Sequence, residues 1–152
     1  MKFIADAMLG RLAKWMRIMG YDVVYDRRIE DRELVNRALK EERMILTKDT
    51  LLVRRKKAKG NSFLVEGNCY KDQIKQVAEE FSLDPHAGLL TRCIGCNVPL
   101  VEICREKVSG SVPGYVYATQ NSYRACPACG KVYWPATHRH GMMKMLEEIF
   151  GS

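Results

Sequence analysis

Two Cys-x-x-Cys pairs constrain this chain more than any other feature of its sequence. Cys93 and Cys96 form the first pair, Cys126 and Cys129 form the second, and 29 residues separate the two pairs. Two-residue spacing lets both thiolates of a pair reach one tetrahedral ion, and a glycine within or beside each pair allows a tight turn. Four thiolates leave no open position on zinc. The pattern therefore predicts a closed, structural Zn²⁺ site whose binding energy becomes folding energy.

The alternatives to a zinc site are two redox motifs or unrelated thiols. A thioredoxin-type pair opens a helix after a strand, which neither pair is expected to do. Residues 89–152 are therefore predicted to form a zinc ribbon, with a β-hairpin between the pairs and a closing helix over 142–150. Cys69 and Cys104 have no partner at such a spacing and are predicted to be ordinary small buried residues.

Residues 1–88 alternate short apolar runs with helical patterns. The apolar runs are 2–5, 22–25, 44–47 and 62–65, and apolar residues recur at helical spacing over 9–19, 34–39 and 72–81. This alternation predicts an α/β domain with a small, mostly parallel sheet and flanking helices. Composition changes near residue 84, so we expect this domain to cover 1–88 and the ribbon to cover 89–152.

Composition excludes several classes of protein. With 152 residues, of which 47% are hydrophobic and 28% charged, the chain matches soluble globular proteins. No uncharged apolar run approaches the roughly 20 residues that a bilayer span needs, so no membrane association is expected. No export signal is visible, and the cysteines are expected to stay reduced. The sequence favours a cytoplasmic protein.

Three aspartates are placed so as to favour a shared site. Asp6 ends the first predicted strand, Asp31 opens the second helix and Asp49 follows the third strand. In a parallel sheet all strand C-termini lie at one edge, where residues far apart in sequence converge. Carboxylates held close together repel one another, and a hard divalent cation relieves the repulsion. The three aspartates therefore predict a Mg²⁺ or Mn²⁺ site suited to phosphoryl chemistry.

Each of these aspartates also has a purely structural explanation. Asp is a favoured helix N-cap, and Asp31 and Asp49 each precede a helical pattern, so either one taken singly is better explained as a cap. Asp6 weakens that explanation, because an acid at the exit of a buried strand needs a solvent crevice or a cation. The set of three therefore favours a metal site.

The charge of the chain favours an anionic partner. Its formal net charge is +7, which steers polyanions towards it. Arg11, Lys14 and Lys48 border the predicted acidic site in the sequence. We expect these cations to hold phosphates against carboxylates that would otherwise repel them.

Features along almost the whole chain carry a family resemblance. They are the opening block FIADAMLGRLAKWMRIMGYDV, the motif Asp31-x-x-Leu34, the block ILTKDTLL, the cysteine pairs, Tyr133-Trp134 and His138. With these features the chain resembles the C-terminal RNase domain of Mut-seven proteins. The resemblance implies a PIN-like, Rossmann-like α/β/α nuclease domain fused to a C-terminal zinc ribbon.

The resemblance also implies roles for individual residues. Asp6, Asp31 and Asp49 fall on the acidic positions of the family, with Thr47 beside the last of them, and His138 falls on a ribbon position suited to contact substrate phosphate. PIN nucleases often have a fourth acid, and none is clearly matched here. The candidates for it are Asp26, Glu66 and Asp72.

These observations lead to one main hypothesis and two competitors. The first is a metal-dependent ribonuclease that hydrolyses phosphodiester bonds of single-stranded or structured RNA, with the ribbon assisting RNA binding. The alternative is a non-catalytic RNA-binding adaptor with a degenerate PIN-like domain, which the missing fourth acid favours. A receiver-like phosphoacceptor domain also gathers aspartates around Mg²⁺, but it needs paired acids after its first strand. The sequence identifies no protein partner.

Overall fold

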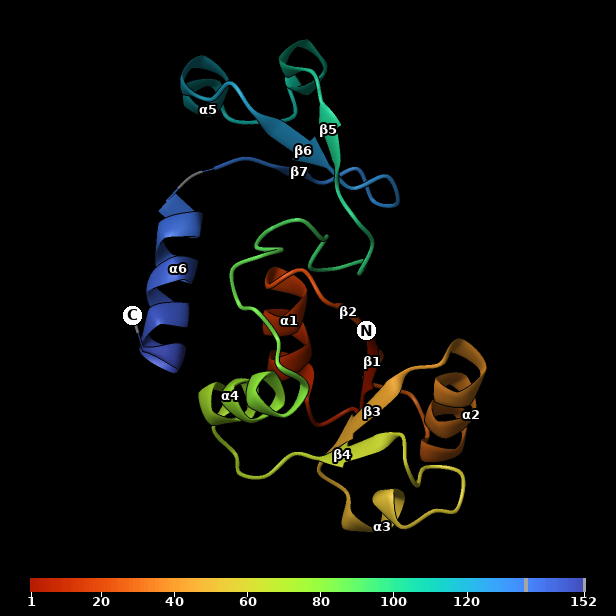
Figure 1. Cartoon of the computed structure of the whole chain (residues 1–152). Helices are drawn as coiled ribbons and strands as arrows, with labels where there is room; N and C mark the ends of the chain where they lie inside the picture. The colour runs from red at the N-terminus through yellow and green to blue at the C-terminus, as the bar shows by residue number, and fades with distance from the viewer. Residues whose placement is uncertain (136, 152) are drawn as a thin grey trace.

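The chain folds into a parallel sheet with flanking helices and a smaller antiparallel sheet at one end (Figure 1). The computed structural model describes residues 1–135 and 137–151, without the side chains of residues 137 and 138. The predicted α/β fold with a parallel sheet is confirmed. The four clustered cysteines lie in the segments before β5 (Val101–Ile103) and between β6 (Tyr123–Ala125) and β7 (Val132–Tyr133) of the second sheet, as expected of a zinc ribbon.

The larger sheet has four parallel strands in the order β2-β1-β3-β4. They are β1 (Lys2–Ala5), β2 (Asp22–Tyr25), β3 (Met44–Thr47) and β4 (Ser62–Leu64). All four begin where the apolar runs predicted them, and β4 ends one residue earlier. Phe3, Ile4 and Ala5 of the inner strand β1 are fully buried, because helices cover both faces of the sheet.

The helices of this unit divide between the two faces of the sheet. They are α1 (Gly10–Ile18), α2 (Asp31–Glu41), α3 (Thr50–Val53) and α4 (Tyr70–Phe81). Alternate residues of β1 point to opposite faces, so Phe3 joins one apolar cluster with α1 and α4, and Ile4 joins another with α2 and α3. The short helix α3 begins directly after Asp49, where the capping explanation of that aspartate places a helix start, but four residues are too few for its length to be predicted from a helical period.

The smaller sheet is antiparallel, in the order β5-β6-β7. Its strands are β5 (Val101–Ile103), β6 (Tyr123–Ala125) and β7 (Val132–Tyr133). The segment between the cysteine pairs is more than the predicted hairpin. It holds β5, a 3₁₀ turn η1 (Arg105–Val108) and the short helix α5 (Gly114–Thr119) before β6 begins.

The last helix, α6 (Thr137–Phe150), returns from the ribbon to the parallel sheet. It begins five residues before the predicted start, and its Leu146 and Ile149 are buried in the same cluster as Phe3. Lys71 of α4 lies 3.2 Å from Glu148 on the outside of this contact. Figure 1 shows α6 beside α1 and α4. α6 lies in the predicted ribbon by sequence but packs on the first unit. The division into 1–88 and 89–152 therefore stays a prediction.

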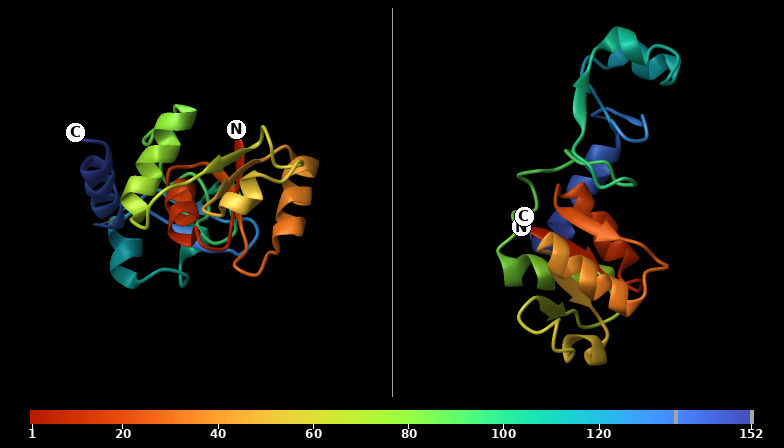
Figure 2. Two further views of the ribbon diagram at one scale, coloured as in Figure 1. Left: turned by 90° about the horizontal axis from the view of Figure 1, so that it is seen from below. Right: turned by 90° about the vertical axis from the view of Figure 1, so that its right-hand side faces the viewer.

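The ribbon docks on the edge of the parallel sheet where the strands begin. Arg17, near the end of α1, donates to the carbonyl of Ile94 at 2.8 Å, and the backbone N–H of Val23 donates to Oδ1 of Asn97 at 2.9 Å. Figures 1 and 2 show the ribbon at this end of the molecule and α3 at the other. The zinc ligands therefore lie at the opposite end of the strands from the edge that carries Asp6.

Asn97 also bonds to an ion pair of the first unit. Oδ1 of Asp22 accepts from Nδ2 of Asn97 and from Nη1 of Arg43, both at 2.7 Å. Burial opposes the ionisation of Asp22, but the bonds from Arg43 and Asn97 outweigh it and lower the pKa of the carboxyl. The contribution to stability is therefore complete above the ordinary pKa of 3.8 and is lost as the pH falls through the lowered value.

We expect Asn97→Gly to destabilise the chain by about 1–3 kcal/mol, because it removes one of the two donors to Asp22 and leaves the Val23 amide without its side-chain acceptor. Asn97 adopts a left-handed conformation with φ 61°, which glycine tolerates, so this variant isolates the side-chain bonds from backbone strain. Urea unfolding measures the change. Asn121→Gly is the control, at an exposed position. Equal stability of the two variants would contradict a docking role for Asn97.

Candidate functional site: an acidic sheet edge and a thiolate cluster

The carboxyl ends of β1 and β3 form the centre of the acidic edge. The strand order reverses between these two neighbours, since β2 lies on one side of β1 and β3 on the other. Ligand crevices in parallel sheets form at such a reversal, outside the carboxyl ends of the strands. Asp6 directly follows β1, and Asp49 follows β3 by two residues. Both acids therefore lie where the fold favours a ligand.

Asp6 is held by the protein from three directions. Its Oδ2 accepts from the hydroxyl of Thr47 at 2.5 Å and from the backbone N–H of Lys48 at 2.9 Å. Its Oδ1 accepts from the N–H of Met8 at 2.9 Å. The side chain is 6% exposed, so these donors offset the cost of burying its charge. The expectation that Asp6 needs a crevice or a cation was incomplete, because amide and hydroxyl donors also stabilise it.

Thr47 links the two acids. Its hydroxyl donates to Asp6 and accepts from the backbone N–H of Asp49 at 3.0 Å, and the residue is fully buried. The sequence placed Thr47 beside Asp49 without giving it a function. A threonine that ends an apolar strand just before an acidic turn is the signal for this role. Thr47 fixes the rotamer of Asp6 and the start of the turn that carries Asp49.

The helix-cap explanation is confirmed for Asp49 and is wrong for Asp31. Asp49 is the N-cap of α3, and its Oδ1 accepts from the N–H of Leu51 at 2.8 Å. Asp31 is the first residue of α2 and caps nothing, because Glu30 holds the cap position. Its carboxylate instead lies 3.8 Å from Arg55 in an exposed ion pair. Asp31 thus forms an ion pair with Arg55, whereas Asp49 bonds to the backbone at the start of α3.

The carboxylates of Asp6, Asp31 and Asp49 do not form a compact group of metal ligands. Among the described side chains, which leave out residues 136–138 and 152, the four cysteines are the one group of three or more His, Cys, Asp or Glu whose ligand atoms all lie within 4.8 Å of one another. The oxygens of Asp6 still suit a hard cation, because their three bonds use three of about four acceptor positions. Asp49 keeps Oδ2 outside its cap bond. The donor chemistry therefore fits Mg²⁺ or Mn²⁺.

The predicted phosphate-binding cations are distributed around this edge. Arg11, in the first turn of α1, is exposed and lies over the ring of Tyr70 at 4.1 Å from its centroid. Lys14 is exposed one turn further along the same helix, and Lys48 bonds to the side chain of Asn68. His138 lies outside the described side chains. Contact of these residues with substrate stays a prediction.

The four cysteines form the second part of the site. Sγ of Cys93 lies 3.9 Å from Sγ of Cys129, and the N–H groups of Ala128 and Cys129 point at Sγ of Cys126 at 3.4 Å. The Tyr133 hydroxyl lies 3.3 Å from Sγ of Cys93. Such spacing and amide donors are typical of a tetrahedral thiolate site.

Without a bound cation, the pKa values of the Cys93 and Cys96 thiols differ widely. Burial opposes ionisation of Cys93, but bonds from Tyr133 and from backbone amides lower its pKa to about 6. Hydrogen bonding with Cys129, with burial second, raises the pKa of Cys96 to about 12. Four thiolates at these distances repel one another, and Zn²⁺ is the ion that such a set neutralises. The cluster is compatible with the predicted structural zinc.

The remaining two cysteines differ from prediction. Cys69 and Cys104 were expected to be buried, and both are exposed. Each immediately precedes a helical element, α4 or η1, where the chain turns at the surface. Sequence spacing identified them correctly as lying outside the metal cluster, but it carries no information on burial.

Comparison with known proteins identifies the family to which the chain belongs. Residues 1–146 match the family described as the Mut7-C RNAse domain. The chain belongs to this family. The match covers the parallel sheet, the ribbon and most of α6, which confirms the resemblance seen in the sequence motifs. The curated proteins and the solved structures compared contain no significant match.

Membership in the Mut7-C RNAse domain family accounts for the combination of features. An RNase domain supports ribonuclease-like function, and the thiolate cluster is compatible with zinc. No helix in the described part of this Mut7-C protein is long and apolar enough to cross a bilayer.

We expect Thr47→Val to lower the free energy of unfolding by about 1–3 kcal/mol, because valine keeps the volume and removes the hydroxyl that serves Asp6 and Asp49. Chemical denaturation measures the change. Thr50→Val, at an exposed position, is the control and should leave stability within about 0.5 kcal/mol. A Thr47→Val variant as stable as the control would contradict the linking role.

We expect the purified protein to bind one zinc ion, and Cys126→Ser to lose it and the order of the ribbon, since zinc binding contributes to folding. Elemental analysis follows the zinc, and tryptophan fluorescence, measured in a Trp15→Phe background so that it reports Trp134, follows the order of the ribbon. Cys104→Ser is the matched control, because Cys104 is exposed and outside the cluster. Retention of zinc by Cys126→Ser would contradict a four-cysteine site.

Proposed function

We propose that this Mut7-C RNAse domain protein is a metal-dependent ribonuclease that hydrolyses RNA phosphodiester bonds at the acidic edge. The observation that carries the proposal is the Asp6–Thr47–Asp49 hydrogen-bonded link at the reversal point of the sheet. Family membership gives the substrate class.

Asp6, Asp31 and Asp49 are the proposed ligands of Mg²⁺ or Mn²⁺. When bound, such an ion supplies a Lewis acid that activates water and stabilises negative charge on the phosphodiester. Asp6 offers the fixed ligand, because Thr47 and two backbone amides already orient it. Its remaining acceptor position faces no further protein donor among the described bonds.

Asp31 and Asp49 would have to adjust to complete the set. The pair between Asp31 and Arg55 is exposed and 3.8 Å long, and such pairs contribute only about 0–1 kcal/mol. Asp49 can offer Oδ2 while Oδ1 still caps α3. Both adjustments cost little, so binding of a divalent ion can drive them.

The proposed role of the nearby cations is to hold phosphate. Arg11 and Lys14 extend from α1, which begins next to Asp6, and Lys48 follows β3. A carboxylate site repels RNA, so catalysis needs positive groups at its border. Arg11 is already oriented by the ring of Tyr70.

The ribbon assists RNA binding from a distance in this proposal. It docks where the strands begin, while Asp6 and Asp49 lie where they end. A substrate that contacts both must run along the domain. His138, in the first turn of α6, is proposed as a phosphate contact on the ribbon side of such a path.

The alternative function is a non-catalytic RNA-binding adaptor. The observation that favours it is the absence of a three-carboxylate group within 4.8 Å over the described residues. Salt-sensitive RNA binding without cleavage under any divalent ion would select the adaptor.

We expect labelled single-stranded RNA to be cleaved when Mn²⁺ or Mg²⁺ is added and to stay intact without it. Zinc content is measured in both samples, so that loss of the ribbon metal during chelation is not mistaken for loss of the catalytic ion. Gel analysis of the products follows the reaction. Cleavage that ignores chelation would contradict the proposal.

Asp6→Asn and Asp49→Asn should each reduce cleavage by about 100-fold or more, since even loss of an outer-shell partner costs 10–100-fold. Glu79→Gln removes one negative charge from the exposed surface of α4 and is the charge control. Thermal unfolding confirms that all variants are folded. Full activity of either aspartate variant would overturn the assignment.

A further inference from the structure

A cavity of about 360 Å³ lies where the ribbon, residues 89–94 and the start of α6 meet. Its lining includes the half-buried rings of Tyr133 and Trp134 and the apolar side chains of Leu90 and Met142. The volume falls in the range of small-ligand sites. The acidic edge makes no use of this space, and the cysteine cluster shares with its wall the Tyr133 hydroxyl and the Ile94 backbone.

The rim of the cavity is positively charged. Arg124, Lys131 and Arg139 line it, all three residues are exposed, and none of its described lining residues is acidic. Lys131 lies 5.2 Å from the centroid of the Tyr133 ring, and Arg124 donates to the carbonyl of Leu90 at 3.3 Å. Aromatic rings beside cations suit a ligand that is flat, unsaturated and attached to negative charge.

We propose that this cavity binds one unpaired nucleobase of single-stranded RNA, with the flanking phosphates on Arg124, Lys131 and Arg139. Single-stranded nucleic acids are held in this way, by base stacking on aromatic side chains and by cations along the backbone. The inference rests on the proposed function for its substrate class. It adds a second RNA site, separate from the acidic edge.

The two sites lie at opposite ends of α1. The N–H of Leu90, in the cavity wall, donates to the carbonyl of Ile18 at the end of α1, while Asp6 precedes the start of that helix. A helix of 9 residues is about 13 Å long, and stacked nucleotides rise about 3.4 Å each. About four stacked nucleotides, or fewer in an extended strand, therefore separate the base in the cavity from the phosphodiester at the acidic edge.

The direct test uses ten-nucleotide single-stranded RNAs with 2-aminopurine at one position, moved along the strand. The zinc-loaded full chain is used without Mg²⁺ or Mn²⁺, and gel analysis confirms that the RNA stays intact. Stacking in the cavity should quench 2-aminopurine fluorescence on binding. Fluorescence anisotropy gives the affinity, and its dependence on salt gives the number of phosphates neutralised.

Two kinds of variant test the cavity. Trp134→Leu should weaken binding by about 10-fold and remove most of the quenching, because it removes a stacking ring. The double variant Lys131→Gln with Arg139→Gln should lower the salt slope by about two, since each cation neutralises one phosphate. Both charged side chains are exposed, so this variant should fold even if Trp134→Leu does not.

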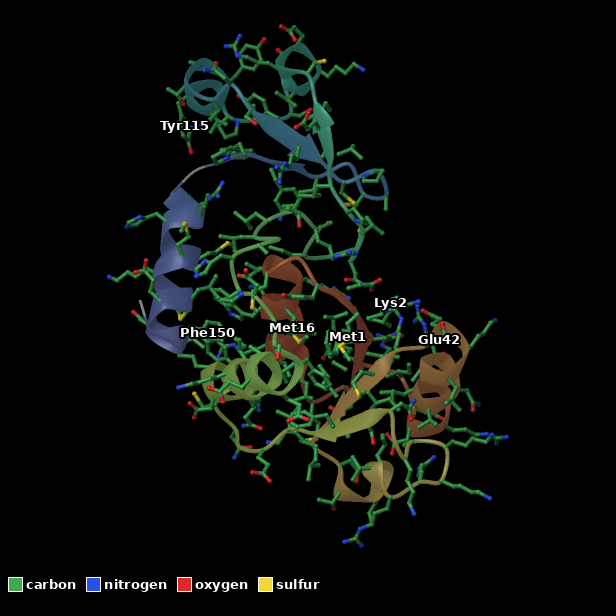
Figure 3. The ribbon with its side chains drawn as sticks, viewed as in Figure 1. Met1, Lys2, Met16, Glu42, Tyr115 and Phe150 are labelled. Carbon is green, nitrogen blue, oxygen red and sulfur yellow. The ribbon has the colours of Figure 1, made fainter. Side chains whose placement is uncertain are left out.

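Matched controls come from the same ribbon. Tyr115 on α5 is 74% exposed and outside the cavity, so Tyr115→Leu removes an aromatic ring without touching the proposed site. Figure 3 labels this side chain on the ribbon, away from the parallel sheet. Lys107→Gln removes an exposed cation from η1. Both controls should bind RNA as the unmodified chain does.

The outcomes separate this inference from the proposed function. Loss of quenching and affinity in the cavity variants alone supports it, even if no metal ever supports cleavage. Cavity variants that bind like the unmodified chain overturn it, even if cleavage is fully active. Absence of quenching at every position also overturns it, and then a protein or small molecule is the ligand to seek.

Discussion

The buried carboxylate of Asp6 is the constraint on which the account of the larger sheet depends. A charged group with 6% exposure is tolerable here only because Thr47 and two backbone amides donate to it. The same bonds join the end of β1 to the end of β3, the two strands between which the order of the sheet reverses. These hydrogen bonds thus link the two central strands and fix the orientation of a buried acid at the edge of the sheet.

The ribbon is attached at the other end by a second polar cluster. Arg17, Asp22, Arg43 and Asn97 connect the first cysteine pair to the beginnings of the strands. The return of α6 to the core around Phe3 adds an apolar contact. The two units are therefore held together at both ends of the ribbon, and the cavity lies between these attachments. An RNA strand that reaches both sites must follow the length of α1.

Local sequence was sufficient for most of the fold and for the thiolate cluster. The strands were found because buried parallel strands are continuous apolar runs, and the cysteine pairs because tetrahedral coordination fixes their spacing. Thr47, Asn97 and the docking of the ribbon were not found, since their roles depend on partners dozens of residues away in the chain. Asp31 and Asp49 were ambiguous from sequence for a physical reason. A residue at a helix start can cap, pair with a cation or bind a metal, and only its surroundings decide between these roles.

Manganese binding at the acidic edge is the central claim, and anomalous diffraction from a crystal soaked in Mn²⁺ tests it most directly. The account predicts a peak within about 2.0–2.6 Å of a carboxylate oxygen of Asp6, with Asp49 and Asp31 turned towards it. It also predicts that Thr47 still donates to Asp6 in that state. A crystal with no peak at this edge, in which Asp31 stays paired with Arg55, would contradict the account.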